Sequence, residues 1–169
     1  MELYRGTRLT VEKVAVRMPD GQERDRVDVH PGDAVAVLPV RADMSCYLIR
    51  QYRFAIGESI IEAPAGTLNS GERPEETAHR ELIEETGFSA ATLIPRGFLY
   101  TTPGFTDERI YLFEAHGLSP SCLYHKDEDE EIEVIRVEID DLPLMIQDGR
   151  ISDAKTIGLV YRCLGPGTI

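Results

Sequence analysis

The segment PEETAHRELIEETGF constrains the fold most, because its residues specify one helix with two definite ends. Ala78 and Leu82 fall on one helical face, and Pro74 suits the first helical turn. Gly87 suits the left-handed position just past the last turn. We therefore predict a helix from 74 to 86.

Alternating and continuous apolar runs predict strands on both sides of this helix. Two alternating segments joined by the turn-rich PDGQ indicate an N-terminal β-hairpin. The expected strands are 9–18, 23–30, 34–40, 45–53, 91–100, 109–116 and 134–139, and a second helix is expected over 152–164, with Ser152 as its cap. The chain is thus of the α/β class, with strands outnumbering helices.

The net charge of the chain limits the classes of molecule that it is expected to bind. A formal charge of −12, from 30 acidic and 18 basic residues, excludes nucleic acid as the expected partner, because phosphate-backbone binding needs a basic surface. A small anionic substrate requires a local reversal of the field, which a bound divalent cation supplies most directly. The charge therefore leaves a small anionic substrate possible only where a bound cation reverses the local field.

Cysteine usage and apolar runs indicate the compartment. Cys46, Cys122 and Cys163 form neither a C-x-x-C pair nor an even set, so neither a disulfide framework nor a zinc site is expected. The first residues lack the pattern of a signal peptide, and no apolar run is long enough to span a membrane. We expect a cytoplasmic protein without membrane contacts.

Three glutamates crowd one side of the predicted helix. Glu81, Glu84 and Glu85 are three and four residues apart, and like charges at this spacing repel by roughly 0.2–0.5 kcal/mol per pair. One interpretation is a solvated polar face, with Arg80 paired to Glu76 and Glu84. The other is a set of oxygen ligands for a hard cation such as Mg²⁺.

The residues around these glutamates distinguish the two interpretations. The segment GTLNSGERPEETAHRELIEETGF resembles the Nudix box, the signature of the Nudix hydrolase family, at each of its defined positions. Seven identities at fixed spacing arise by chance at a given start on the order of once in a billion. The fixed positions are Gly66, Glu72, Arg80, Glu81, Glu84, Glu85 and Gly87, with apolar Leu82 and Phe88. The glutamates are therefore interpreted as a metal platform.

The resemblance implies a fold, a domain organisation and a metal. The fold would be an α/β/α sandwich with a mixed β-sheet, spanning 33–169, preceded by an antiparallel β extension over 1–32. Mg²⁺, with Mn²⁺ as a substitute, would be bound by Glu81, Glu84 and Glu85 and by the carbonyl of Ala65. Arg80 would orient Glu72 or another carboxylate, and Glu84 and Arg80 would be part of the catalytic machinery.

Segments outside the box resemble the ADP-ribose pyrophosphatase branch of the family. These are IRQYRFAIGESIIEAPAG before the helix and TTPGFTDERIYLFEA after it, with Pro103 sixteen residues beyond Gly87. The resemblance implies substrate binding by Arg53, Glu62, Pro103, Gly104, Phe105 and Glu108. TTPGFTDE could equally be a connecting turn, and Arg53 a surface charge, while Tyr52 and Phe54 are expected to pack rather than bind.

The acidic run KDEDEEIE has two interpretations as well. Most such runs are solvated loops. In the ADP-ribose branch, a loop at this place supplies a general base and a further metal ligand, which assigns Glu128 as the base and Glu130 as the ligand, with a shift of one or two residues left open.

The expected reaction is Mg²⁺-dependent hydrolysis of ADP-ribose, a small nucleoside diphosphate, to AMP and ribose 5-phosphate. The alternatives are a pyrophosphatase for another nucleoside diphosphate sugar and a non-catalytic sensor of nucleotides. The resemblance also implies a homodimer in which the N-terminal sheet crosses to the partner. The alternative is a hairpin that packs on its own domain.

Overall fold

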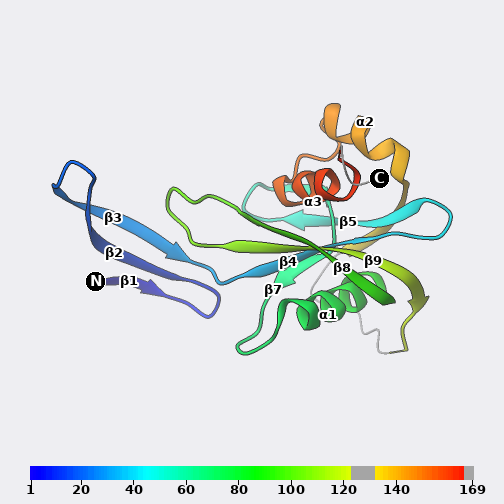
Figure 1. Ribbon diagram of the computed structural model, residues 1–169, viewed down its shortest axis with the longest axis horizontal. Coiled ribbons are helices and arrows are strands. Elements are labelled where there is room, and N and C mark those ends of the chain that lie inside the picture. The colour runs from blue at the N-terminus through cyan, green and yellow to red at the C-terminus, as the bar shows by residue number, and fades with distance from the viewer. Residues whose placement is uncertain (123–131, 166–169) are drawn as a thin grey trace.

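The computed structural model describes residues 1–122 and 132–165 and shows an α/β/α sandwich from which an arm of three strands projects (Figure 1). The strands are β1 Glu2–Arg5, β2 Thr10–Arg17, β3 Glu23–His30, β4 Ala34–Pro39, β5 Ser45–Arg53, β6 Glu58–Glu62, β7 Ala65–Thr67, β8 Phe88–Tyr100, β9 Arg109–Pro120 and β10 Ile132–Glu138. The helices are α1 Pro74–Thr86, the 3₁₀ turn η1 Ile139–Asp141, α2 Leu142–Gln147 and α3 Ala154–Leu164. The predicted α/β/α sandwich with a mixed sheet is confirmed.

A four-stranded sheet in the order β7-β4-β9-β8 forms the centre of the sandwich. It is mixed, because β4 runs parallel to β9 and antiparallel to β7, and β8 is antiparallel to β9. A second antiparallel sheet, β10-β5-β6, packs beside it, and β1-β2-β3 make the arm. None of the described helices is long and apolar enough to cross a membrane.

Strand β4 divides the core between the two helical layers. Val35 and Val37 face the cluster that contains Ala78 and Leu82 of α1. The alternate positions of the strand face the larger cluster, which includes α2, α3 and the second sheet. Because successive side chains of a strand point to opposite faces, this short run of buried aliphatic residues serves both layers at once.

Helix α1 begins and ends as predicted. Arg73, a poor cap residue, occupies the position before the helix. Its backbone N–H is bound by the side chain of Glu76 at 3.0 Å, so the first turn is closed by a carboxylate inside the helix. Gly87 has φ +78°, the left-handed conformation expected of a glycine at this end.

Two expectations are corrected here. Asp153, not Ser152, caps α3, and its side chain accepts a hydrogen bond from Thr156 N–H at 2.9 Å. Tyr52 and Phe54 do not pack in the chain, since they are 54% and 90% exposed. They lie at the tip of the β5–β6 hairpin, which extends beyond the core.

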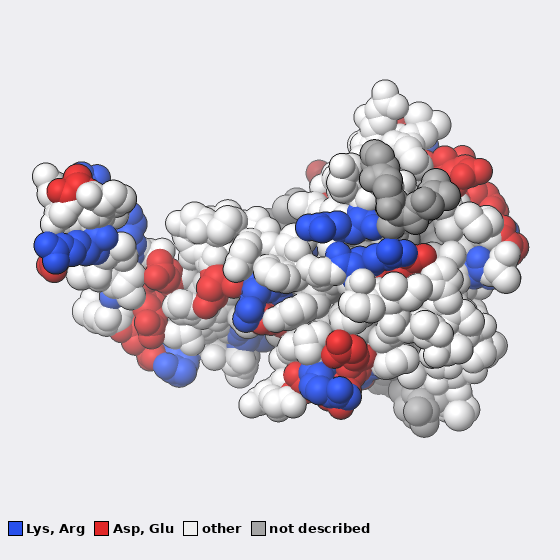
Figure 2. Space-filling model, viewed as in Figure 1, with Lys and Arg blue, Asp and Glu red and all other residues white. Residues whose placement is uncertain are grey.

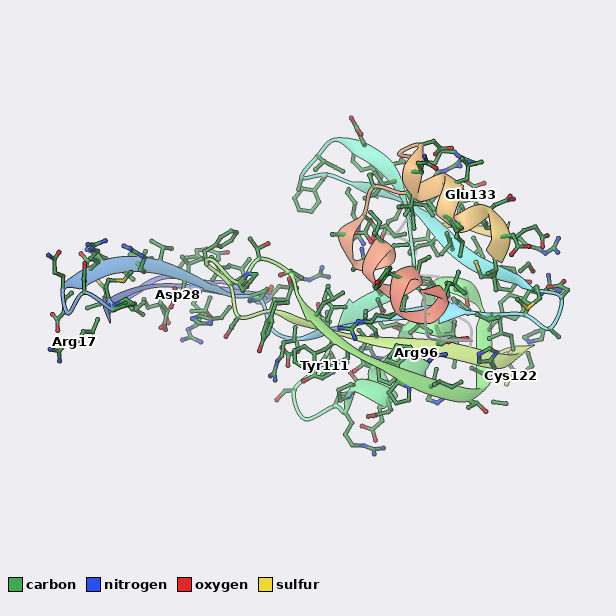
Figure 3. All side chains as sticks on the ribbon, turned by 45° about the horizontal axis from the view of Figure 1, so that its top comes forward. Arg17, Asp28, Arg96, Tyr111, Cys122 and Glu133 are labelled. Atoms are coloured by element: carbon green, nitrogen blue, oxygen red, sulfur yellow. The ribbon has the colours of Figure 1, made fainter. Side chains whose placement is uncertain are left out.

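The arm makes few contacts with the body. Arg17 lies at its far tip (Figure 3), and charged side chains of both signs lie on the face of the arm that Figure 2 shows. The junction is a backbone hydrogen bond of 2.8 Å from Val29 N–H to the carbonyl of Phe105, together with an ion pair between His30 and Asp107. The strand β1 was not predicted, because it is short and exposed along its whole length.

Leu82→Ala tests the α1 side of the core. Leu82 is fully buried, so we expect its truncation to lower the free energy of unfolding by about 2–5 kcal/mol. Leu144→Ala, at an exposed position of α2, is the control and should change it by less than about 0.5 kcal/mol. Denaturant unfolding of both variants measures the difference, and equal effects would contradict this assignment of the core.

Candidate active site

The glutamates of α1 separate into a buried pair and an exposed residue. Glu81 and Glu85 are 9% and 8% exposed and line a cavity of about 740 Å³, whereas the side chain of Glu84 is half exposed at its edge. Four-residue spacing places the buried pair one turn apart on the same face. A solvated polar face therefore does not describe Glu81 and Glu85.

Arg80 joins the carboxylates of the box. Its Nη1 lies 2.6 Å from Glu81 Oε1 and 2.9 Å from Glu84 Oε2. Its Nε and Nη2 each lie 3.0 Å from an oxygen of Glu72, and this contact lowers the pKa of Glu72 to about 2. Arg80 itself has a raised pKa, chiefly because of its hydrogen bonds to Glu72. One guanidinium thus forms charge-assisted hydrogen bonds with three carboxylates.

Strand β7 approaches the Glu81 side chain of α1 very closely at Gly66. A Cβ built on Gly66 would lie 1.9 Å from Glu81 Oε1, so any side chain there would displace this carboxylate. The neighbouring Ala65 N–H donates a hydrogen bond of 2.8 Å to Glu85 Oε2. Strand β7 therefore positions both buried carboxylates.

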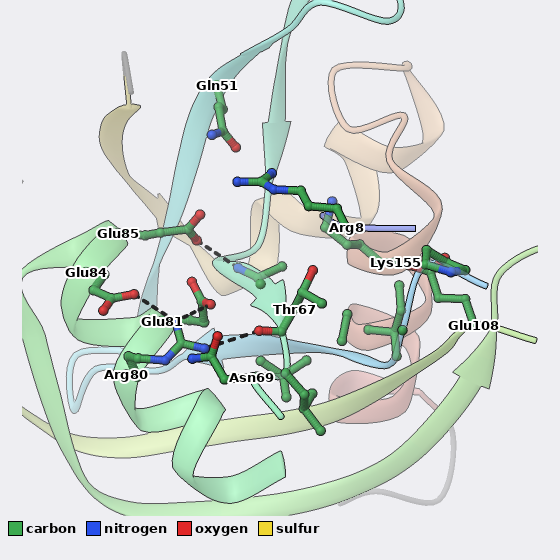
Figure 4. Close-up of a pocket in the computed structure, with 18 of the residues that line it drawn as sticks. Arg8, Gln51, Thr67, Asn69, Arg80, Glu81, Glu84, Glu85, Glu108 and Lys155 are labelled. Atoms are coloured by element: carbon green, nitrogen blue, oxygen red, sulfur yellow. Dashed lines mark hydrogen bonds and ion pairs between the residues drawn. The ribbon is translucent and has the colours of Figure 1, made fainter. Parts of the chain in front are cut away.

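The opposite wall carries cations (Figure 4). Arg53 forms a bidentate pair with Glu62, with Nε–Oε1 and Nη2–Oε2 distances of 2.7 and 2.6 Å. Lys155 of α3 contacts the same carboxylate. Burial would raise the pKa of Glu62, which is 1% exposed, but the two cations more than offset it, and the pKa lies below its ordinary value.

Helix α3 fixes this wall through its first turn. Thr156 Oγ1 accepts a hydrogen bond of 2.8 Å from Ala63 N–H, next to Glu62 in the chain. The same hydroxyl donates to the capping carboxylate of Asp153 at 2.6 Å. The cap of α3 and the segment leading to β7 therefore form one hydrogen-bonded unit.

The predicted loop residues are only partly brought together. Glu108 lines the cavity and accepts a hydrogen bond of 2.7 Å from the Thr101 hydroxyl. Pro103, Gly104 and Phe105 are exposed and lie toward the arm, outside the described lining of the cavity. Glu128 and Glu130 lie outside the described residues.

The lining residues that the sequence analysis missed include Arg8, Gln51 and Lys155, whose side chains can bind an anionic or polar group. Gln51 shares the pattern IRQYR with Arg53, which could have indicated it, since alternate residues of a strand face the same side. Lys155 follows the cap of α3, and Arg8 lies between β1 and β2, so neither had a local signal that pointed to this cavity.

The donor set is compatible with a divalent cation. Among the described residues there is no group of three His, Cys, Asp or Glu side chains already gathered for a metal, since Arg80 holds Glu81 and Glu84. Mg²⁺ needs fewer, because it is usually bound by one or two carboxylates together with water and substrate phosphate. Glu81 and Glu85, beside the backbone of Ala65, meet this requirement.

Gly66→Ala tests whether the close approach of Gly66 to the Glu81 carboxylate is needed for metal binding. We expect the variant to fold but to bind Mn²⁺ at least about tenfold more weakly, because the new methyl group displaces a carboxylate and not the backbone. Gly104→Ala is the control, since a Cβ there meets no atom within 4 Å. Calorimetric titration with Mn²⁺ measures both, and equal affinities would contradict the role of this close approach.

Comparison with known proteins agrees with this geometry. The NUDIX domain model matches residues 30–158. The ADP-ribose pyrophosphatase of Bacillus subtilis is 40% identical over 92% of this chain and 84% of its own length. The methanol dehydrogenase activator of Bacillus methanolicus is 38% identical over 92% of this chain and 85% of its own length.

A solved structure described as an ADP compounds hydrolase superposes with a TM-score of 0.86. It is 25% identical and covers the whole chain and 94% of its own chain. The match extends over all the layers of the sandwich and the arm. With the box glutamates in the cavity and the domain match over most of its length, the chain belongs to the Nudix hydrolase family.

Proposed function

We propose that this protein hydrolyses ADP-ribose to AMP and ribose 5-phosphate in a Mg²⁺-dependent reaction. The observation that carries the proposal is the cavity itself, in which two buried carboxylates of α1 face a wall that contains Arg53 and Lys155. The relative from Bacillus subtilis is named an ADP-ribose pyrophosphatase, which supports the choice of substrate.

The metal site is assigned to Glu81 and Glu85, with the carbonyl of Ala65. Glu84 and Glu130 are proposed as additional ligands, and Mn²⁺ as a substitute. A divalent cation bound there supplies Lewis acidity, an acidified water and neutralisation of the diphosphate charge. Glu81 lies against Gly66, and Glu85 is held by the N–H of Ala65, so both carboxylates are oriented before a cation arrives.

The remaining residues bind substrate and handle the proton. Arg53, held by Glu62, faces the cavity as a donor for the diphosphate or nucleotide, and Glu108 with the loop Pro103–Gly104–Phe105 is assigned to the distal ribose. Water adds to one phosphorus, the bridging P–O bond breaks, and the proton passes to Glu128, the proposed base. Arg80 holds Glu72, Glu81 and Glu84 in place through ion pairs to all three.

A regulatory role is the second candidate function. It is favoured by the relative that is named an activator of methanol dehydrogenase. A sensor would bind a nucleotide in the same cavity without turnover, and a third candidate within the hydrolase class is a pyrophosphatase for another nucleoside diphosphate sugar. Turnover and product identity separate the three.

A substrate panel with a matched pair of variants tests the proposal. We expect hydrolysis to be fastest with ADP-ribose, which gives AMP, compared with ADP-glucose, GDP-mannose and NADH, and to occur only when Mg²⁺ is present. Glu85→Gln should lower kcat by about 100-fold or more, because it removes a ligand charge, and Glu75→Gln, an exposed residue of the same helix, should not. Chromatography identifies the products.

Each alternative outcome has a definite meaning. Faster cleavage of another sugar nucleotide would replace the substrate. Binding of ADP-ribose without any turnover would favour the sensor. An active Glu85→Gln variant would remove this residue from the metal site.

We also propose that the protein is a homodimer joined through the arm. Register places Tyr4, Val11, Val27 and Val29 on one face of the small sheet, together with the Lys13–Asp25 ion pair nearer its tip. The other face carries Glu12 and Asp28, which lie directly opposite each other. A small sheet with exposed apolar residues and little core of its own needs a surface to pack against, and a partner subunit would supply one.

Val27→Asp tests the dimer. A carboxylate among these apolar residues should shift the protein from dimer to monomer, because burying a charge in an interface is costly. Met44→Asp, at an exposed turn of the body, is the control and should leave the mass unchanged. Sedimentation velocity measures both, and a monomeric wild-type protein would refute the proposal.

A further inference from the structure

Lys155 has no assigned role, although its position in the cavity wall is specific. Its side chain is only 14% exposed, and its ammonium contacts Glu62 and, at 3.1 Å, Asp153 Oδ2. Figure 4 shows it across the cavity from the glutamates of α1. A largely buried lysine with two carboxylate partners is held in one place, which is unusual for such a flexible side chain.

The ion-pair network that contains Lys155 has no net charge only when Lys155 is present. Arg53 and Lys155 contribute two positive charges, and Glu62 and Asp153 contribute two negative charges, so the network is neutral. Without Lys155 it would carry one net negative charge, opposite a wall that already contains Glu81 and Glu85. The described lining of the cavity would then lose one of its four cations, and a diphosphate would be attracted less strongly.

Lys155 also donates one of the hydrogen bonds that the Glu62 carboxylate accepts. Oε1 of this carboxylate accepts from Arg53 Nε, while Oε2 accepts from Arg53 Nη2 and from Lys155. Since Glu62 is nearly inaccessible to solvent, water cannot readily replace a lost donor. Removing Lys155 would leave Arg53 as the only cation on the carboxylate and draw the guanidinium more strongly away from substrate.

We propose that Lys155 is a positioning residue for the anionic substrate: it neutralises the largely buried carboxylates of Glu62 and Asp153 behind the cavity wall and leaves the guanidinium of Arg53 available to the diphosphate. The proposal rests on the proposed function, because it requires a nucleoside diphosphate in this cavity. It deepens that function by adding a residue of α3, distant in sequence from the box, to the substrate site.

A set of four variants separates charge from packing. Lys155→Met should raise the KM for ADP-ribose about tenfold and lower kcat less, and Lys155→Arg should restore most of the affinity. Asp153→Asn keeps a good helix cap and should not raise KM. The double variant Asp153→Asn/Lys155→Met should bind more tightly than Lys155→Met alone, because the network is neutral again.

Binding of ADP-ribose in the presence of EDTA, measured by calorimetry, gives a readout that does not depend on turnover. Lys155→Gln provides a polar replacement if Lys155→Met does not fold, and thermal unfolding of each variant reports folding. If Lys155→Met and Lys155→Gln both bind ADP-ribose with the affinity of the wild-type protein, the proposal is wrong. A double variant no better than Lys155→Met would also overturn it, since packing rather than charge would then explain the loss.

Failure of the proposed function gives a different pattern. If the wild-type protein prefers another nucleoside diphosphate sugar, the same variants are compared with that compound and the role of Lys155 is still tested. If the wild-type protein neither binds nor hydrolyses any compound of the panel, the proposed function is wrong, and the role of Lys155 is wrong with it.

Discussion

The rest of the site depends on the ion pairs between Arg80 and the carboxylates around it. Glu72, Glu81 and Glu84 would repel one another, and a single guanidinium with hydrogen bonds to all three holds them together. The arrangement leaves Glu81 and Glu85 directed into the cavity, although both are almost buried. The fold therefore tolerates a concentration of negative charge that an isolated helix would not.

Packing turns this local arrangement into a site. One face of α1, which carries Ala78 and Leu82, packs against Val35 and Val37 of β4. The helix also contacts β7. Contact at that point is so close that a side chain larger than glycine at position 66 would displace the carboxylate of Glu81. The precision of the carboxylates thus derives from an apolar interface, since packed aliphatic side chains permit little sliding.

The second half of the cavity comes from a different part of the chain. Helix α3 contributes Lys155 and, through Thr156, a hydrogen bond to the backbone between β6 and β7. This contact joins residues more than ninety positions apart in sequence. An acidic protein thereby presents cations where an anionic substrate is proposed to enter.

The sequence by itself determined the family, the helix over 74–86 and the order of most strands, because the period of apolar residues and the spacing of the box are local properties. It also indicated that Arg80 meets Glu72, a contact that the structure shows. It could not indicate the exposed tip with Tyr52 and Phe54, the cap at Asp153 or the short strand β1, where local preferences are weak or ambiguous. Only the tertiary structure decided that Glu84 is exposed while Glu81 and Glu85 are buried, and that Arg8, Gln51 and Lys155 share their cavity, because these facts depend on how distant elements pack against one another.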